Sequence, residues 1–437
     1  YRNEQSFCAT AFGLHAACET LILLRDKMSS QQLEAFCIEL SRSEQWLRER
    51  DNPLAANQQV ASCTGRYVLG TLLDDQTISD WAERDLQKVR SDLEKTGFLA
   101  EYGGPDVGYT LLSMDLLVAA HQAGLSVTEP LATEVCRCLS TLMSESKYLP
   151  FELGSRATRH QFFGGIAYFS QFLPAAEEFL QRSNWYSPIV QGDALFGYDD
   201  RYFATFGFTA FARRVIFSRT ELATGQTTEP RLIASRSEIT SEKCGDGTLF
   251  IHTGFGCSLS WIKDATVSAT HLGYVFRDAK GRRWTSLAPT DGKKQWIRFV
   301  KATDSSPLVK WETLVRFIFV LCRYSAFARV VSWLARTKVG RSRRKSTIAF
   351  SREISYDQEK LKVKDRIRFG PGTSGQISIV SEFPFYSPSS MYLNVGVLNP
   401  EQFTIHVEPE CKTSEVNICW ELSISGSNSI EVGSQWQ

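Results

Sequence analysis

The chain has 437 residues, which corresponds to two or three domains at about 150 residues each. Hydrophobic residues make up 43% and charged residues 22%, which excludes a disordered tail, a collagen-like fibre and a small disulfide scaffold. Lys and Arg number 49 against 48 Asp and Glu, so the net charge of +1 gives no overall basic field for nucleic acid.

The first half of the chain has the period of α-helices. Apolar residues recur at steps of three and four from Phe7 to Leu21, from Leu33 to Leu40 and from Leu86 to Leu93. Further helices are expected over 54–73, 108–123, 129–146, 160–181 and 200–216. This succession of helices leaves no room for a parallel sheet in the first 220 residues.

The second half changes to the period of β-strands, after a polar, turn-rich segment over 221–230. Strands are expected over 248–253, 257–263, 267–277, 294–300, 361–369, 376–381, 402–407 and 415–424. Over 361–369, Lys and Arg alternate with four apolar residues and Asp365. That alternation is typical of an antiparallel strand with one face in solvent.

Residues 308–345 interrupt the strand pattern. Ten basic residues and one acid, Glu312, lie between Lys310 and Lys345, among long apolar runs. The pattern predicts two short amphipathic helices with a bend near Ser325. Each Arg at the bilayer centre would cost about 3 kcal/mol, so the segment suits peripheral contact with an anionic membrane rather than a span. The alternative is that these helices pack on the strands.

Three local motifs carry a resemblance to a known family. They are Asn57-Gln58 at a helix start, Glu101-Tyr102-Gly103-Gly104-Pro105-Asp106 followed by Gly108-Tyr109, and Gly154-Ser155-Arg156 followed by Thr158. The helical half resembles the heparinase II/III-like and alginate-lyase-like polysaccharide lyases. The second half is similar to heparinase-like proteins of exopolysaccharide clusters, through the strand–turn over 272–278 and the strand region over 351–369.

The resemblance implies an α+β chain of two domains. The first is an (α/α) toroid of helical hairpins over 1–225, and the second is an antiparallel β-sandwich over 230–437 that contains the 308–345 insertion. It also implies β-elimination on an acidic, uronate-containing glycan, in exopolysaccharide processing. No cofactor and no metal are expected for this reaction.

A uronate lyase must neutralise the substrate carboxylate, remove the neighbouring proton and protonate the leaving oxygen. We expect Asn57 to neutralise the carboxylate, His160 to act as the base and Tyr102 to share the acid–base chemistry. The expected substrate-binding residues are Tyr109, Asp106, Arg156, Arg159, Tyr202 and Arg201. All of them would lie at one mouth of the toroid.

The same residues also have structural interpretations. Asn57 suits a helix N-cap, and the loop from Tyr102 to Tyr109 suits a helix cap built around a Gly-Gly-Pro turn. A single His such as His160 is more often structural than catalytic, and Asp199 or Asp200 could cap the helix that follows it.

Two other functions remain open. Ala157 and Arg159 stand where such relatives often carry an Asn and an acidic residue, which favours a non-catalytic glycan-binding or scaffolding protein. A glycoside hydrolase would need paired carboxylates, which Glu101 and Asp106 with Asp199 or Asp200 could supply.

Other ligand classes receive no support from the sequence. The six His residues are scattered without metal-ligand spacing, and no Gly-rich loop precedes a Lys-Ser or Lys-Thr pair for a nucleotide. A nucleic-acid site would rest on 341–345 alone. The expected partner is an acidic polysaccharide; the oligomeric state stays open. We expect a bacterial periplasmic location or the cytoplasm and membrane periphery, with no targeting segment visible in the sequence.

Overall fold

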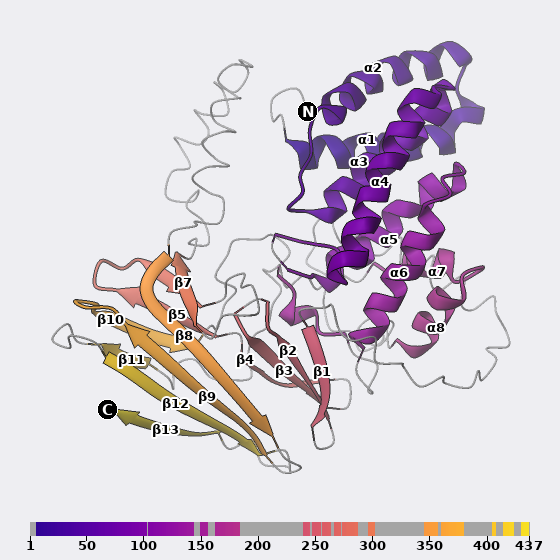
Figure 1. Ribbon diagram of the computed structural model, residues 1–437. Helices are drawn as coiled ribbons and strands as arrows, with labels where there is room; N and C mark the ends of the chain where they lie inside the picture. Colours follow the sequence, from indigo (N-terminus) through magenta and orange to yellow (C-terminus); the bar gives the residue numbers. More distant parts are fainter. Residues whose placement is uncertain are drawn as a thin grey trace. The chain divides into compact units, whose positions relative to one another are not determined.

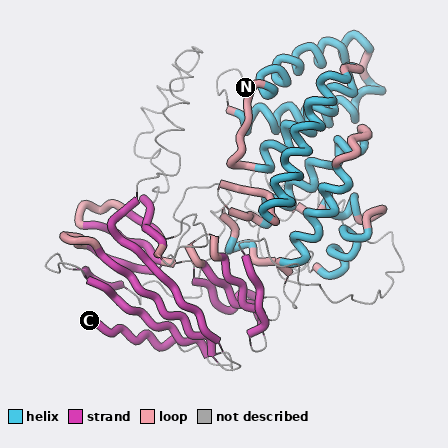
Figure 2. The backbone as a smooth tube through the Cα atoms, in the orientation of Figure 1, coloured by secondary structure: helices cyan, strands magenta, loops and turns pink. Residues whose placement is uncertain are grey.

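The computed structural model describes 15 segments of the chain. They are residues 6–102, 104–143, 149–155, 162–183, 239–244, 247–254, 256–263, 266–271, 273–286, 296–301, 345–356, 360–379, 404–407, 414–423 and 430–436. Internal contacts divide these segments into two units (Figures 1 and 2). The helical unit holds the described residues of 6–141 and 162–183, and the sheet unit holds those of 142–155 and 239–436.

The helical unit contains eight α-helices within its described residues, in the regions where the sequence period predicts helix. They are α1 (Phe7–Leu24), α2 (Ser30–Arg48), α3 (Ala56–Leu73), α4 (Gln76–Thr96), α5 (Val107–Gln122), α6 (Thr128–Thr141), α7 (Gly164–Phe169) and α8 (Pro174–Arg182). A short 3-10 helix, η1 (Arg25–Lys27), follows α1. Helix α3 packs against α1, α4 and α5, so most of its residues are buried.

Side-chain caps fix where several of these helices begin. Ser29 and Gln32 form a reciprocal capping box at the start of α2. Asp75 accepts the N–H groups of Thr77 and Ile78 at the start of α4. Each cap satisfies N–H groups that the helix itself cannot pair, and so defines its first turn.

The helix predicted over 160–181 is wrong as a single element. The structure has two helices, α7 and α8, separated by residues 170–173. Pro174 opens α8 in its first turn, where a proline loses nothing because the N–H at that position has no partner in the helix. Inside one continuous helix its ring would clash with the preceding turn.

Helix α7 lies very close to α5. A Cβ atom on Gly165 would stand 2.3 Å from the carbonyl of Met114, so only glycine fits at this contact. The Gly165 N–H donates to the buried carboxyl of Asp115. Burial raises the pKa of Asp115 well above its usual range, while the Gly165 hydrogen bond acts in the opposite direction. The contact fixes α7 to the middle of α5.

The sheet unit consists of two antiparallel sheets. The four-stranded sheet has the order β1-β2-β3-β4, with β1 (Ile239–Cys244), β2 (Gly247–His252), β3 (Ser258–Lys263) and β4 (Thr266–His271). The 3-10 helix η2 (Phe151–Leu153) packs against β3. The carbonyl of Leu153 lies 2.6 Å from Nδ1 of His252, which places His252 as a buried structural residue.

The nine-stranded sheet has the order β11-β10-β5-β6-β7-β8-β9-β12-β13. Its strands are β5 (Tyr274–Asp278), β6 (Arg283–Thr285), β7 (Ile297–Lys301), β8 (Lys345–Tyr356), β9 (Lys360–Phe369), β10 (Gly375–Ile379), β11 (Thr404–Val407), β12 (Ser414–Ser423) and β13 (Ile430–Trp436). The predicted order of helices followed by antiparallel strands is therefore confirmed. The strands β1, β6 and β13 were not predicted from the sequence, and the strand region expected over 351–369 forms two strands, β8 and β9.

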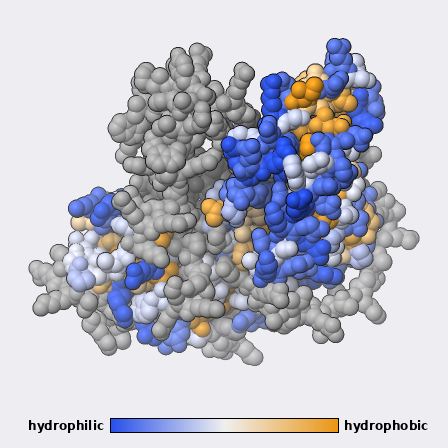
Figure 3. Space-filling view, turned by 45° about the horizontal axis from the view of Figure 1, so that its top comes forward, coloured by the Kyte–Doolittle hydropathy of each residue, from blue (hydrophilic) through white to orange (hydrophobic). Residues whose placement is uncertain are grey.

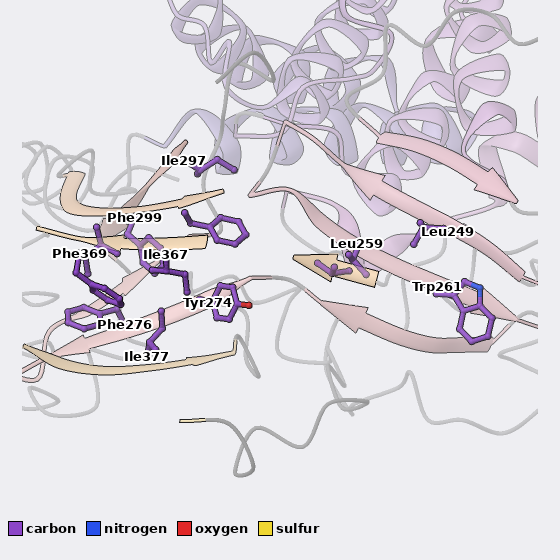
Figure 4. Packing of buried hydrophobic residues seen from close by; sticks show 13 residues of the cluster. Leu249, Leu259, Trp261, Tyr274, Phe276, Ile297, Phe299, Ile367, Phe369 and Ile377 are labelled. Atoms are coloured by element: carbon purple, nitrogen blue, oxygen red, sulfur yellow. The ribbon is translucent and has the colours of Figure 1, made fainter. Parts of the chain in front are cut away.

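Strand β9 has the alternation that the sequence predicts. Val363, Asp365, Ile367 and Phe369 are buried, and Lys364, Arg366 and Arg368 are exposed. The buried face joins a cluster to which both sheets contribute, with Leu249, Leu259 and Trp261 from the four-stranded sheet (Figure 4). Tyr274, Phe276 and Ile377 belong to the same cluster from the nine-stranded sheet.

The single strand predicted over 267–277 is also wrong. The chain forms two strands there, β4 and β5, in different sheets. Gly273 lies between them with φ of +110°, a conformation that side-chain-bearing residues rarely adopt. The glycine thus allows the chain to leave one sheet and enter the other.

Several predictions fall outside the described residues. These are the helix over 200–216, the boundary near 225–230, and nearly all of the 308–345 insertion with its membrane contact. The domain limits of 1–225 and 230–437, the toroid and the sandwich therefore stay predictions.

The first helix has an apolar surface. The segment Phe7–Lys27 is long enough to cross a membrane and contains an 18-residue window with a mean hydropathy of 1.6, a test that a core helix or a signal sequence also passes. Leu23 on α1 and Phe36 and Ile38 on α2 are among the exposed large hydrophobic side chains, and Figure 3 shows hydrophobic surface on the helical unit.

Candidate functional site

Two segments far apart in sequence meet at the start of α3. The Ala56 N–H donates to the Ala100 carbonyl at 2.9 Å, and Ala55 pairs with Glu101 as an isolated β-bridge. Ala55 has no side chain that can cap α3, and the Glu101 carboxylate accepts the Asn57 N–H at 3.1 Å instead. A carboxylate at this position also faces the positive end of the helix dipole. The loop after α4 therefore caps α3.

Tyr102 stands in this loop in a strained backbone conformation. Its φ is +50°, in the left-handed region that aromatic residues rarely occupy. Its N–H donates to the Leu54 carbonyl, and Gln58 Nε2 donates to its hydroxyl at 3.3 Å. Gln58 is held in turn by Asn52 Nδ2 at 2.7 Å. Strain of about 1–3 kcal/mol persists only where surrounding contacts over-determine the geometry, as they do here.

The structure brings Asn57 and Tyr102, both predicted site residues, to the same end of the helical unit. Asn57 is 2% exposed, and its Oδ1 has no hydrogen-bond partner in the described part of the chain. Asp106 is the N-cap of α5, since its carboxylate accepts the Tyr109 N–H at 3.0 Å. Tyr109 is partly buried in the first turn of that helix. The Asp106 carboxylate thus acts as a helix cap, as the alternative interpretation of this loop predicts.

The other predicted site residues lie outside the described residues. These are Arg156, Arg159, His160, Arg201 and Tyr202. Their roles, and a groove shared with Asn57 and Tyr102, stay predictions.

A cavity of about 480 Å³ adjoins the same segments. Pro53, Ala56 and Ala100 contribute to its lining, so it shares a wall with the backbone that carries Asn57 and Tyr102. Its volume falls within the usual range for small-molecule sites. Sequence reasoning missed this cavity, because its polar residues come from three helices and from the loop after α2, and follow no motif.

Charged side chains of those helices form a connected group beside the cavity. Arg66 on α3 donates to Asp85 on α4 at 2.9 Å and lies 3.5 Å from Glu44 on α2. Arg48 contacts Glu44 at 3.2 Å and lies over the ring of Trp81, while Lys88 contacts Asp85 at 2.7 Å. Burial raises the pKa of Glu44, and the charges of Arg48 and Arg66 act in the opposite direction.

A second polar group lies at the far end of α5. His121 Nδ1 lies 2.8 Å from the Tyr168 hydroxyl, and His121 Nε2 lies 3.1 Å from Glu129 Oε1. The imidazole stacks on Phe172 with 5.0 Å between ring centroids. Twelve residues of helix separate His121 from Tyr109, about 18 Å along the axis. This group is therefore separate from the Tyr102 loop, and it joins α5, α6 and α7.

We expect Tyr168→Phe to lower the free energy of unfolding by about 1 kcal/mol. The substitution leaves His121 Nδ1 without its hydroxyl partner while it keeps the ring contacts. Denaturant titration measures the change. Tyr67→Phe is the matched control, because the hydroxyl of Tyr67 makes no hydrogen bond with the described residues. Equal stability of the two variants would contradict the prediction.

Among the described residues, no group of three or more His, Cys, Asp or Glu side chains could hold a metal ion.

Comparisons with known proteins place the fold. No protein-family model matches the sequence, and no curated protein matches it significantly. Among solved structures, the chondroitin AC lyase of Streptomyces coelicolor A3, in complex with chondroitin sulphate, matches with a TM-score of 0.51 and 11% identity. The match covers 85% of this chain and 56% of that one. A Paenibacillus xanthan lyase matches with a TM-score of 0.47 and 10% identity, over 93% of this chain and 42% of that one.

The chain thus spans about half the length of the solved structures it matches. Similarity to the chondroitin AC lyase extends across most of this chain, helices and strands alike. At 11% identity the comparison concerns the arrangement of the backbone and not the chemistry. The chain has a polysaccharide-lyase-like fold.

Proposed function

We propose that the chain acts on an acidic, uronate-containing glycan by β-elimination. The fold shared with a lyase solved with chondroitin sulphate supports the substrate class. The observation that carries the proposal is Tyr102, an aromatic residue held at a φ of +50° by backbone contacts and by Gln58. Strained residues cluster at functional sites, where the strain orients a reactive group.

Tyr102 supplies the acid–base chemistry in this proposal. Its phenol accepts a hydrogen bond from Gln58, the next residue after Asn57 in α3. In this proposal Asn57 neutralises the substrate carboxylate with its Nδ2 donor as the enolate forms. His160 acts as the base that removes the proton, and Arg156, Arg159, Arg201, Tyr109 and Tyr202 hold the acidic chain. The kinship with heparinase II/III-like proteins and the role in exopolysaccharide processing belong to the same proposal.

We expect Tyr102→Phe to lower kcat by about 10²-fold or more, with a much smaller change in KM, because a positioned acid or base contributes about 10²–10⁴-fold. The measurement is the absorbance of the unsaturated uronate product with a panel of uronic polysaccharides. Tyr168→Phe is the matched control, since it also removes a tyrosine hydroxyl, one that contacts His121 at the opposite end of α5 from Tyr109. Equal kcat in the two variants would remove Tyr102 from the mechanism.

The same assay separates the alternative functions. New reducing ends without the unsaturated product would indicate a hydrolase, which would require the carboxylates of Glu101 and Asp106 at the reacting bond. The N-cap position of Asp106 weighs against that role. Glycan binding without any cleavage would indicate a binding or scaffolding protein, and would overturn the proposed reaction.

A further inference from the structure

The charged group between α2, α3 and α4 is a network of ion pairs around one buried arginine. It contains three cations, Arg48, Arg66 and Lys88, against two carboxylates, Glu44 and Asp85. Arg66 lies at its centre and is 2% exposed. A buried charge is stable only when counter-charges and hydrogen bonds satisfy it.

One edge of the Arg66 guanidinium is unsatisfied. Nη1 donates to Asp85, whereas Nε and Nη2 have no hydrogen-bond partner in the described part of the chain. Glu44 Oε1 forms an ion pair with Nε at 3.5 Å, longer than a normal hydrogen bond, while Glu44 Oε2 contacts Arg48. The Nε and Nη2 groups of an arginine point in parallel, and together they fit two oxygens of one carboxylate or sulfate.

The cavity of about 480 Å³ brings the remaining pieces together. Arg66 lines it with Arg48 and Lys88, and Gln59 adds an amide. An unsatisfied buried donor in a native structure requires an explanation such as a bound ion or ligand. A ligand-sized cavity beside such a donor supplies one.

We propose that this cavity is an oxyanion site, in which Nε and Nη2 of Arg66 hold a carboxylate or sulfate group. Arg48, Arg50 and Lys88 line the same cavity, but the carboxylates of Glu49, Asp51, Asp85 and Asp92 balance the cations of the lining. The site therefore depends on the hydrogen-bond donors of Arg66 rather than on net charge, and Gln59 offers a hydrogen bond to a sugar hydroxyl. The anion completes the hydrogen bonding of a buried guanidinium that the protein leaves half satisfied.

The proposal deepens the proposed function and rests on it for the identity of the ligand, an acidic sugar. The lining residues Ala56 and Ala100 lie one and two positions along the chain from Asn57 and Tyr102. An acidic glycan that reaches Tyr102 could therefore place the acid group of another sugar unit in the cavity. Arg66 is a binding residue in this scheme and takes no part in the chemistry.

Binding of small anions tests the site without any need for cleavage. The probes are inorganic sulfate and glucuronate at constant ionic strength, with glucose as the neutral control, and calorimetry measures the affinity. We expect both anions to bind and Arg66→Lys to weaken them at least tenfold, because lysine keeps the charge but loses the paired donors. Binding of sulfate but not glucuronate would assign the site to sulfated sugars. Binding of glucuronate but not sulfate would assign it to uronates.

Arg42→Lys is the matched control, because Arg42 is an exposed α2 residue that pairs with Glu39 away from the cavity. Equal affinity in the two variants, or no binding to the wild type, would overturn the site. β-Elimination without Arg66-dependent binding would refute the site and leave the reaction intact. Arg66-dependent binding without β-elimination would support the site and refute the reaction.

Should Arg66→Lys fail to fold, the wild-type protein still decides. Crystals grown with selenate in place of sulfate should show an anomalous peak within hydrogen-bond distance of Arg66 Nη2. Glu44 found instead with both oxygens on Nε and Nη2 would overturn the proposal, because the protein would then satisfy its own guanidinium.

Discussion

Asp365→Asn should lower the stability of the sheet unit by about 3–5 kcal/mol, since it leaves a fully buried arginine without its counter-charge. Arg352 on β8 and Asp365 on β9 are cross-strand neighbours, and both side chains are 0% exposed. Arg352 Nε donates to Asp365 Oδ1 at 2.8 Å and Nη2 donates to Oδ2 at 2.7 Å. Asparagine keeps the shape of the side chain but removes the charge.

The contacts around this pair explain the size of the effect. Arg352 Nη1 donates to the carbonyls of Cys257 and His271, and Tyr274 donates its hydroxyl to Asp365 at 2.6 Å. Burial alone would raise the pKa of Asp365, but the adjacent guanidinium and its hydrogen bonds hold it well below the usual range. The group connects the last strand of the smaller sheet to β5, β8 and β9 of the larger one.

Denaturant titration measures the loss, with hydrogen exchange in β8 and β9 as a readout confined to the sheet unit. Glu353→Gln is the matched control. Glu353 is exposed on β8, next to Arg352, and lies 3.8 Å from Arg366 on β9. Exposed pairs contribute little, so we expect a change below about 0.5 kcal/mol. A loss in Asp365→Asn as small as in the control would contradict the prediction.

The fold could be predicted from the sequence where one physical signal dominates. The 3.6-residue period gave the helices of the first half, and strict alternation gave both faces of β9. Asp365 stands in the alternating apolar set, but the sequence analysis did not predict a buried ion pair there. The identity of the partner, Arg352, depends on cross-strand register, which the sequence of β9 does not contain.

Errors arose where one residue changes the path of the chain. Gly273 separates two strands that read as one, and Pro174 begins a second helix.

The candidate site could likewise be predicted only where a local motif marks it. Local motifs drew attention to Asn57 and Tyr102, but the Arg66 group joins three helices through charges with no common spacing. Such a group is visible only once the helices are packed.

His271 should make the sheet unit lose stability as the pH falls from about 6.5 to about 4. Burial, together with the positive charge of Arg352, lowers the pKa of His271 to about 4, against 6.5 for an ordinary histidine. Its ring lies between the Gly273 N–H, 3.2 Å from Nδ1, and Arg352 Nη2, 2.9 Å from Nε2. Asp365 is 3.4 Å away and favours the charged ring, though not enough to offset burial.

The sign follows from which state binds the proton. Between pH 6.5 and 4 the unfolded histidine is protonated while the folded one stays neutral, so acid favours unfolding. Stability is complete above pH 6.5, and a difference of 2.5 pH units corresponds to a loss of about 3 kcal/mol at pH 4. Denaturant titrations at several pH values should show this loss of stability. Hydrogen exchange in β8 and β9 should show it within the sheet unit.

His271→Gln is the decisive variant, because glutamine keeps hydrogen-bonding capacity and does not titrate. The loss of stability between pH 6.5 and 4 should shrink by about 3 kcal/mol in this variant, whatever its stability at pH 7. Groups with raised pKa values, such as Asp115 and Glu44, titrate alike in both proteins and cancel in the comparison. Parallel pH profiles for the wild type and His271→Gln would show that the folded protein accommodates a charged imidazole beside Arg352, and would refute the assignment.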